Sequence, residues 1–143
     1  MNKLLLSTVI IIATTIHIGF TQDLKEKDVP AVVRNSFTKK YPGAKKVTWE
    51  KEKGNFEANW GGRTGEDNSA VFTPSAEFVE LVEAIPVSQL PSAVASFVIK
   101  HYKGVKISEA GKVTDAAGVR MFEAEIKGKD LIFDEQGIFI RED

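Results

Sequence analysis

Apolar side chains recur at every fourth position in two stretches of the chain, which predicts two amphipathic helices. The repeating positions are Val29, Val33, Phe37 and Tyr41 in the first stretch and Leu90, Val94, Val98 and Tyr102 in the second. Pro30 and Pro91 stand in the first turn, where a missing N–H is harmless. Gly43 and Gly104 follow the last apolar position, where the chain must leave a helix. Each helix should have about three turns.

After each predicted helix, apolar and polar residues alternate as in strands with one buried face. In the segment 56–60, for example, Phe56, Ala58 and Trp60 alternate with Glu57 and Asn59. The predicted strands are 47–50, 56–60, 70–72, 77–82, 105–113, 121–127, 130–133 and 138–141. Because short turns connect them, neighbouring strands should be antiparallel.

The two stretches also resemble each other in sequence. Val29-Pro30 through Tyr41-Pro42-Gly43 matches Leu90-Pro91 through Tyr102-Lys103-Gly104, 61 positions later. Further on, the motif Phe-Glu-Ala at Phe56–Ala58 recurs at Phe122–Ala124. The pattern therefore predicts an internal duplication, in which a short linker joins two copies that pack on each other.

These observations predict an α+β fold of two tandem α-β4 repeats, with one antiparallel sheet and the helices packed on one of its faces. We divide the chain into a leader at 1–21, a first repeat at 22–85 and a second at 86–143, the repeats together forming one compact domain. A single α-β4 unit buries little apolar surface, which favours joining two. The other face of the sheet should meet water. The binding residues predicted on this open face are Thr48, Glu50, Glu57, Asn59, Glu123 and Glu125.

Residues 1–21 have the pattern of a secretory signal peptide. Lys3 precedes a long apolar run, and Gly19 and Thr21 are small residues that suit cleavage before Gln22. The alternative is an uncleaved membrane anchor, because the run from Leu4 to Phe20 is close to the shortest membrane span. Either interpretation predicts an extracytoplasmic protein, periplasmic or secreted.

Composition excludes several classes of function. The 143-residue chain has 19 basic and 20 acidic residues, so no overall positive charge attracts nucleic acid or anionic lipid. It has no cysteine, which excludes disulfides, thiolate metal sites and a cysteine nucleophile. No pattern in the chain predicts a metal or a cofactor.

Several motifs together resemble the PepSY-like, β-lactamase-inhibitor-like family of bacterial envelope proteins. They are Tyr41–Ala44 (YPGA), Lys46–Glu50 (KVTWE), Asn55–Ala58 (NFEA) and Phe133–Ile140 (FDEQGIFI). The resemblance covers nearly all of the chain after the leader. It implies tandem helix-plus-sheet units, a periplasmic or secreted location, no catalysis, and binding or inhibition of another protein. The second copy departs from the pattern, since Lys103 replaces Pro42 and no tryptophan corresponds to Trp49 or Trp60.

Other candidate sites have simpler explanations. His101 falls at a helix C-terminus without a nearby base or ligand. The glycine-rich segment Gly61–Gly65 leads into a strand, so it lacks the helix N-terminus of a phosphate loop. Acidic residues near 130–135 are typical of turns and too few for a calcium loop. Trp49 and Trp60 fit the core by alternation, although a role as anchors for a partner stays open.

The sequence thus predicts a non-enzymatic, extracytoplasmic binding module that uses its open sheet face, with inhibition of an envelope protein as one form of that role. The alternative is a small-ligand carrier or sensor with a pocket between the repeats, lined by Trp49 or Trp60. A hydrolase is disfavoured because no serine, histidine and carboxylate are presented together.

Overall fold

A computed structural model describes residues 22–143 of the chain. The predicted leader, residues 1–21, lies outside the described residues. The strands are β1 (Gln22–Leu24), β2 (Thr48–Glu52), β3 (Asn55–Trp60), β4 (Asn68–Phe72), β5 (Phe78–Ala84), β6 (Glu109–Asp115), β7 (Arg120–Ile126), β8 (Lys129–Asp134) and β9 (Phe139–Glu142). The helices are α1 (Ala31–Lys40) and α2 (Ser92–His101), each preceded by a short 3-10 helix, at Glu26–Asp28 and Val87–Gln89.

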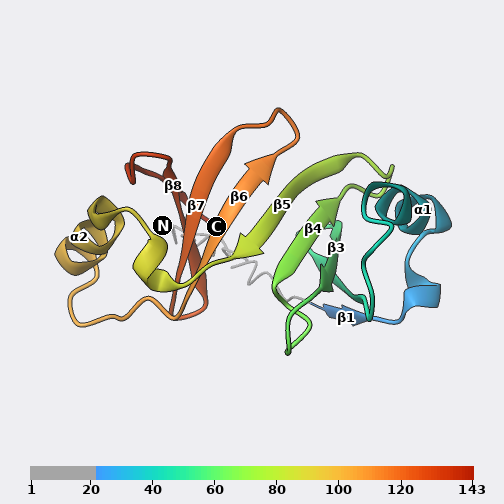
Figure 1. The fold of residues 1–143 in the computed structure, drawn as a ribbon, viewed down its shortest axis with the longest axis horizontal. Coiled ribbons are helices and arrows are strands. Elements are labelled where there is room, and N and C mark those ends of the chain that lie inside the picture. The colour runs from blue at the N-terminus through green and yellow to red at the C-terminus, as the bar shows by residue number, and fades with distance from the viewer. Residues whose placement is uncertain (1–21) are drawn as a thin grey trace, which may run out of the picture.

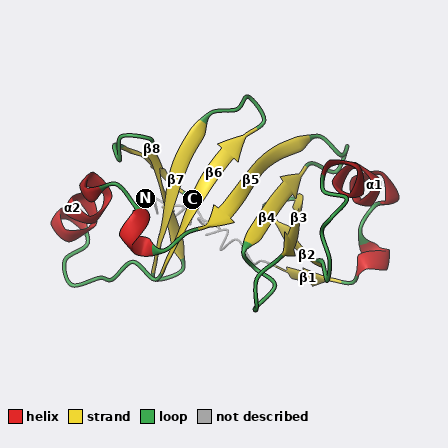
Figure 2. Ribbon diagram, in the orientation of Figure 1, coloured by secondary structure: helices red, strands yellow, loops and turns green. Residues whose placement is uncertain are grey.

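The predicted fold class, two tandem α-β4 repeats with the helices packed on one face, is wrong. The nine strands of residues 22–143 form one continuous antiparallel sheet in the order of the sequence, from β1 to β9. Figure 2 shows β5 in the middle of this sheet, between β4 and β6. The predicted boundary between the halves is not a break in the sheet, because β5 pairs with β6 from Glu80↔Asp115 to Ala84↔Gly111. This pairing leaves no free edge in the middle of the molecule, where an open edge would invite aggregation.

The helices are short and do not form a layer over the whole sheet. Figure 1 shows α1 and α2 at opposite ends of the long axis, with β5 and β6 between them. Each helix has ten residues, begins directly after a proline (Pro30 or Pro91), and ends with basic residues in its last turn. Pro42 follows the first helix, and Gly104 turns the chain after the second with a φ of 75°.

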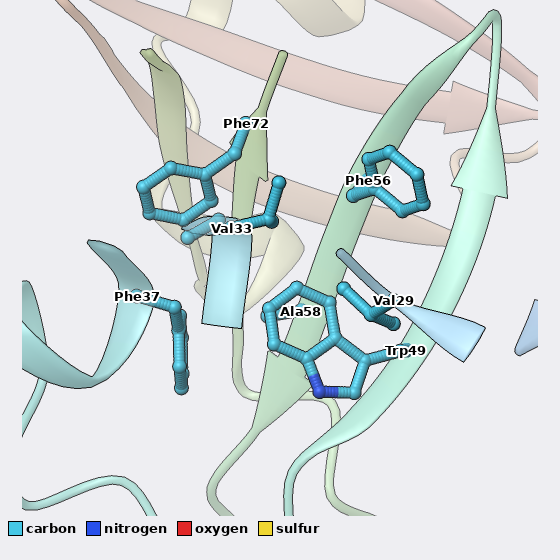
Figure 3. Close-up of a cluster of buried hydrophobic side chains, with 8 residues drawn as sticks. Val29, Val33, Phe37, Trp49, Phe56, Ala58 and Phe72 are labelled. Atoms are coloured by element: carbon cyan, nitrogen blue, oxygen red, sulfur yellow. The ribbon is translucent and has the colours of Figure 1, made fainter. Parts of the chain in front are cut away.

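The two larger clusters of buried apolar side chains lie at the two ends of the sheet. At one end, α1 supplies Val33 and Phe37 to a cluster with Trp49, Phe56 and Phe72 of the sheet (Figure 3). At the other end, α2 supplies side chains to a second cluster. Its buried members are Val94, Val98, Ala124, Ile126, Leu131 and Phe133. Apolar burial therefore holds each helix to its own end of the sheet.

Both tryptophans lie on the face that carries the helices. Trp49 is 4% exposed and meets Phe37 edge to face at 5.3 Å between ring centroids. Trp60 is half-buried and packs between Phe37 and Tyr41, at 5.1 Å and 4.8 Å. Trp49 is thus a core residue, and Trp60 borders the same core.

Candidate functional site: an acidic hollow on the open face

Alternation along the strands sends carboxylates to the face opposite the helices. On β3, Phe56 and Ala58 are buried on the helix side, whereas Glu57 points to the open face. On β7, Ala124 and Ile126 belong to the core under α2, and Glu123 and Glu125 alternate with them. The period of two that defines a strand therefore produces a one-sided acidic surface.

This surface borders a hollow of about 350 Å³, which we call the acidic hollow. Its acidic lining residues are Glu50, Glu52, Glu57, Glu66, Glu80, Glu109, Glu123, Glu125, Asp130 and Asp143. Lys53 is the basic residue in the lining, and the remaining positions are small, polar or aliphatic. Within residues 22–143 the lining is therefore dominated by negative charge.

The hollow brings together five of the six predicted binding residues. Glu50, Glu57, Asn59, Glu123 and Glu125 all line it. Thr48 does not; it is exposed at the first position of β2. The lining also includes Glu80 on β5 and Asp130 on β8, which we did not predict as site residues. The sequence could have indicated Glu80, because it alternates with Leu81 in the predicted strand 77–82.

Curvature of the sheet creates the hollow. Glu52 on β2 and Asp130 on β8 line the same space, although six strand spacings separate them. In a flat sheet that separation would be roughly 29 Å. The sheet therefore bends around the open face and concentrates carboxylates from distant strands.

Crowding and burial disfavour charge on several of these groups. Burial, together with Asp130, Glu80, Glu57 and Asp143 nearby, raises the pKa of Glu123 to about 8. At pH 7 this carboxyl is therefore mostly protonated.

Asp130 is the second strongly affected carboxyl. Burial and the charges of Glu125 and Glu52 raise its pKa to about 6, and Lys53 partly opposes the rise. The pKa values of Glu57 and Glu80 are also raised, in both cases chiefly by burial. The hollow consequently holds fewer negative charges near neutral pH than its carboxyl count suggests, and a nearby cation would increase the number that ionise.

Hydrogen bonds fix some of the lining carboxylates. The Ser69 hydroxyl donates to Glu57 Oε1 from the adjacent strand β4. The Ser108 hydroxyl donates to Glu125 Oε1 at 2.7 Å. At the edge of the sheet, Arg141 forms an ion pair with Asp143, with Nη2 and Oδ2 2.9 Å apart. These contacts orient carboxylates without neutralising most of the negative charge.

Among the described residues, the lining of the acidic hollow includes no histidine. No three His, Cys, Asp or Glu side chains between residues 22 and 143 are grouped as a metal site. His101 lies on the helix α2, where its ring is tilted against that of Phe97 with the ring centroids 4.3 Å apart. What the hollow offers is a curved, acidic surface for binding.

A second hollow, of about 400 Å³, is lined by residues of β5–β7 and the turn after β8. Its lining residues are Glu83, Lys112, Val113, Thr114, Arg120, Met121, Phe122 and Glu135. Neither Trp49 nor Trp60 lines it, so it differs from the aromatic pocket predicted for a small-ligand carrier.

Comparison with known proteins identifies similar folds. No protein-family model matches the chain, and no curated protein matches it in sequence. A candidate periplasmic protein from Bacteroides eggerthii has a similar solved structure, with a TM-score of 0.63 and 20% identity over 80% of this chain and 88% of that chain. The solved structure of a DUF2874 family protein from Bacteroides uniformis is similar with a TM-score of 0.62 and 22% identity, over 80% of this chain and 88% of that chain.

A BLIP-like protein from Bacteroides fragilis is also similar, with a TM-score of 0.55 and 20% identity over 80% of this chain and 84% of that chain. This agrees with the β-lactamase-inhibitor-like part of the resemblance seen in the sequence, whereas the comparisons give no support to the PepSY-like part. The predicted periplasmic location agrees with the description of the Bacteroides eggerthii protein. No helix between residues 22 and 143 is long and apolar enough to cross a bilayer.

Proposed function

We propose that this protein is a non-enzymatic binding module of the bacterial envelope that holds another protein against its acidic hollow. The observation that carries the proposal is the convergence of carboxylates from β2, β3, β5, β7 and β8 on one curved surface. Folding brings these like charges together at a cost in electrostatic repulsion. A partner that supplies positive charge would relieve that repulsion, so the carboxylates favour binding of a basic partner.

The partner's chemistry follows from the lining. A protruding segment rich in lysine or arginine complements a surface in which Lys53 is the basic residue among ten acidic ones. The hollow is of a size that admits side chains rather than a folded domain. We therefore expect a basic loop or strand of the partner to enter it.

The similarity to a BLIP-like protein supports a protein partner over a small ligand. Inhibition of that partner is one consequence of such binding, if the inserted segment also serves the partner's own activity.

Capture from envelope extract of the source bacterium tests the proposal. The chain is immobilised and retained proteins are identified by mass spectrometry, with Glu57→Lys and Glu125→Lys together as the test variant. Glu26→Lys and Asp28→Lys together are the matched control, because both side chains are exposed on the 3-10 helix before α1 and two charges are again reversed. We expect specific partners to be lost with the double variant, retained with the control, and released by moderate salt. Equal capture by all three chains would overturn the proposal.

A further inference from the structure

The last strand of the sheet has a free edge. β9 pairs with β8 on one side, and no other strand between residues 22 and 143 pairs with it. Asp143 exchanges both of its backbone hydrogen bonds with Asp130 of β8. Because these groups alternate in direction along a strand, the N–H and C=O of Glu142 point away from β8. Glu142 therefore offers one donor and one acceptor that no group within residues 22–143 occupies, and an incoming strand could pair with both.

The central strand β5 has the same local geometry as β9, and its outer edge is paired with another strand. β5 and β9 meet their preceding strands with the same local geometry, a register shift beside a phenylalanine pair. The rings of Phe72 and Phe78 are 5.8 Å apart, and those of Phe133 and Phe139 are also 5.8 Å apart. On β5 the outer edge is filled by the antiparallel strand β6.

The surroundings of the β9 edge are suited to contact with another molecule. Ile138, directly before β9, and Ile140, within it, are 63% and 48% exposed, so two large apolar side chains meet solvent at this edge. On the other side, Asp143 lines the acidic hollow, and the charges of Arg141 and Asp143 influence Glu80 and Glu123. An added strand would thus lie beside exposed isoleucine side chains on one face of the sheet and beside the acidic hollow on the other.

Charge argues against a second copy of this chain as the occupant. Glu142 is the residue whose outward backbone groups are established as unpaired within residues 22–143, so a two-fold pairing of β9 with β9 that joins these groups to each other places Glu142 opposite Glu142. Like charges directly opposite each other destabilise a strand pair. Charged residues on an edge strand are also a recognised protection against self-association.

We propose that the free edge of β9 binds an extended segment of a partner polypeptide as a tenth, antiparallel strand, with basic side chains of that segment directed toward the acidic hollow. The choice of basic residues rests on the proposed function; the backbone pairing does not. Main-chain hydrogen bonds would supply affinity, and the alternating side chains would supply selectivity.

A designed peptide tests the backbone pairing directly. The probe is a short synthetic peptide of alternating valine and arginine, blocked at both ends, with binding to the full chain measured by fluorescence anisotropy. A second peptide carries N-methyl groups on the backbone edge that would face β9, which removes hydrogen-bond donors and keeps the charge. We expect the methylated peptide to bind about tenfold more weakly. Equal affinity of the two peptides, or no binding by the first, would overturn the proposal.

Variants at Glu142 test the site. Glu142→Pro removes the outward N–H without breaking a bond to β8, and prolines are tolerated at such edge positions. Glu142→Ala is its control, because both variants lose the side-chain contacts to Tyr102 and Lys129. We expect Glu142→Pro to bind the peptide about tenfold more weakly than Glu142→Ala, and amide exchange at position 142 of the wild type to slow when the peptide binds.

Equal affinity of the two Glu142 variants, or unchanged exchange, would overturn the edge site even if the acidic hollow still captured a partner through Glu57 and Glu125. Concentration-dependent dimerisation of the chain that Glu142→Pro abolishes would also overturn the proposal, in favour of a second copy. A valine–threonine peptide that binds as tightly as the valine–arginine peptide would overturn the assignment of basic residues.

Discussion

Glu123 on β7 lies directly opposite Gly111 on β6, so the carboxyl with the most strongly raised pKa faces a residue without a side chain. A Cβ atom on Gly111 would lie 2.6 Å from Val82 Cγ1 and 3.9 Å from Glu123 Cβ. The glycine thus permits close packing of Val82 at the floor of the acidic hollow. An apolar cluster of Val113, Met121 and Ile132, with Val82 against it, lies in the same region of the sheet.

Replacement of Gly111 by alanine should destabilise the fold. The new methyl group must displace Val82 within a packed cluster, at a cost of about 1–3 kcal/mol in the free energy of unfolding. Gly43→Ala is the control, because a methyl group on Gly43 would have no neighbouring atom within 4 Å and the residue has no positive φ. Urea unfolding of the three chains measures the difference. Equal stability of Gly111→Ala and wild type would show that Val82 moves aside freely.

The raised pKa of Glu123 makes stability depend on pH in a defined direction. Its pKa is about 8 in the folded state, against 4.5 for an exposed glutamate. Between these values the folded state binds more protons than the unfolded state, so the free energy of unfolding falls as pH rises. The contribution is fully present below pH 4.5 and is lost as pH rises through 8.

We therefore expect Glu123→Gln to be more stable than the wild type at pH 9, by an amount on the order of a few kcal/mol, and to differ less from it at pH 5. Urea unfolding at a series of pH values measures both curves, with Glu26→Gln as the control for an exposed glutamate. Parallel curves for wild type and Glu123→Gln would contradict the raised pKa.

Much of the local structure could be predicted from the sequence, whereas the fold class could not. Four-residue spacing identified the segments that form α1 and α2, and alternation identified the strand around Phe56–Trp60. The pairing of β5 with β6 is a contact between segments about 30 residues apart, which local periodicity does not report. The strand Gln22–Leu24 has only three residues, too few to show alternation.

For the candidate site, the sequence indicates on which face the residues lie but not how close together they come. Alternation alone placed Glu57, Glu123 and Glu125 on one face, because a strand fixes side-chain direction. That Asp130 of β8 approaches Glu52 of β2 depends on curvature of the whole sheet, and so does the rise in pKa at Asp130. No residue pattern within β2 or β8 indicates that these two strands come close together.

Phe37 should be essential for the core at the α1 end. Its ring contacts those of Tyr41, Trp49, Trp60 and Phe72, with centroids 5.1 to 6.3 Å apart. Phe37→Ala removes this aromatic centre and should lower the free energy of unfolding by about 3–5 kcal/mol. Val32→Ala, at a position 57% exposed on the same helix, should change it by less than about 0.5 kcal/mol. Thermal unfolding followed by tryptophan fluorescence compares the two, and similar losses for both would show that α1 does not pack on the sheet as described.

Binding of a basic segment should release protons from the carboxyl groups of the acidic hollow. At pH 7 Glu123 is largely protonated, and a cation placed beside it lowers its pKa and releases its proton. The valine–arginine peptide should therefore bind more tightly as pH rises from 6 to 9, by about tenfold for each unit by which it lowers the pKa.

Calorimetry in two buffers of different ionisation enthalpy measures this release, because the heat of binding then differs between the buffers in proportion to the protons exchanged. We expect a net release of protons near pH 7 and a smaller release with Glu123→Gln. Asp130→Asn should reduce the release mainly below pH 7, because the pKa of Asp130 is about 6. Identical heats in both buffers would mean that the peptide binds away from the acidic hollow, since no cation can approach these two carboxyls without altering their ionisation.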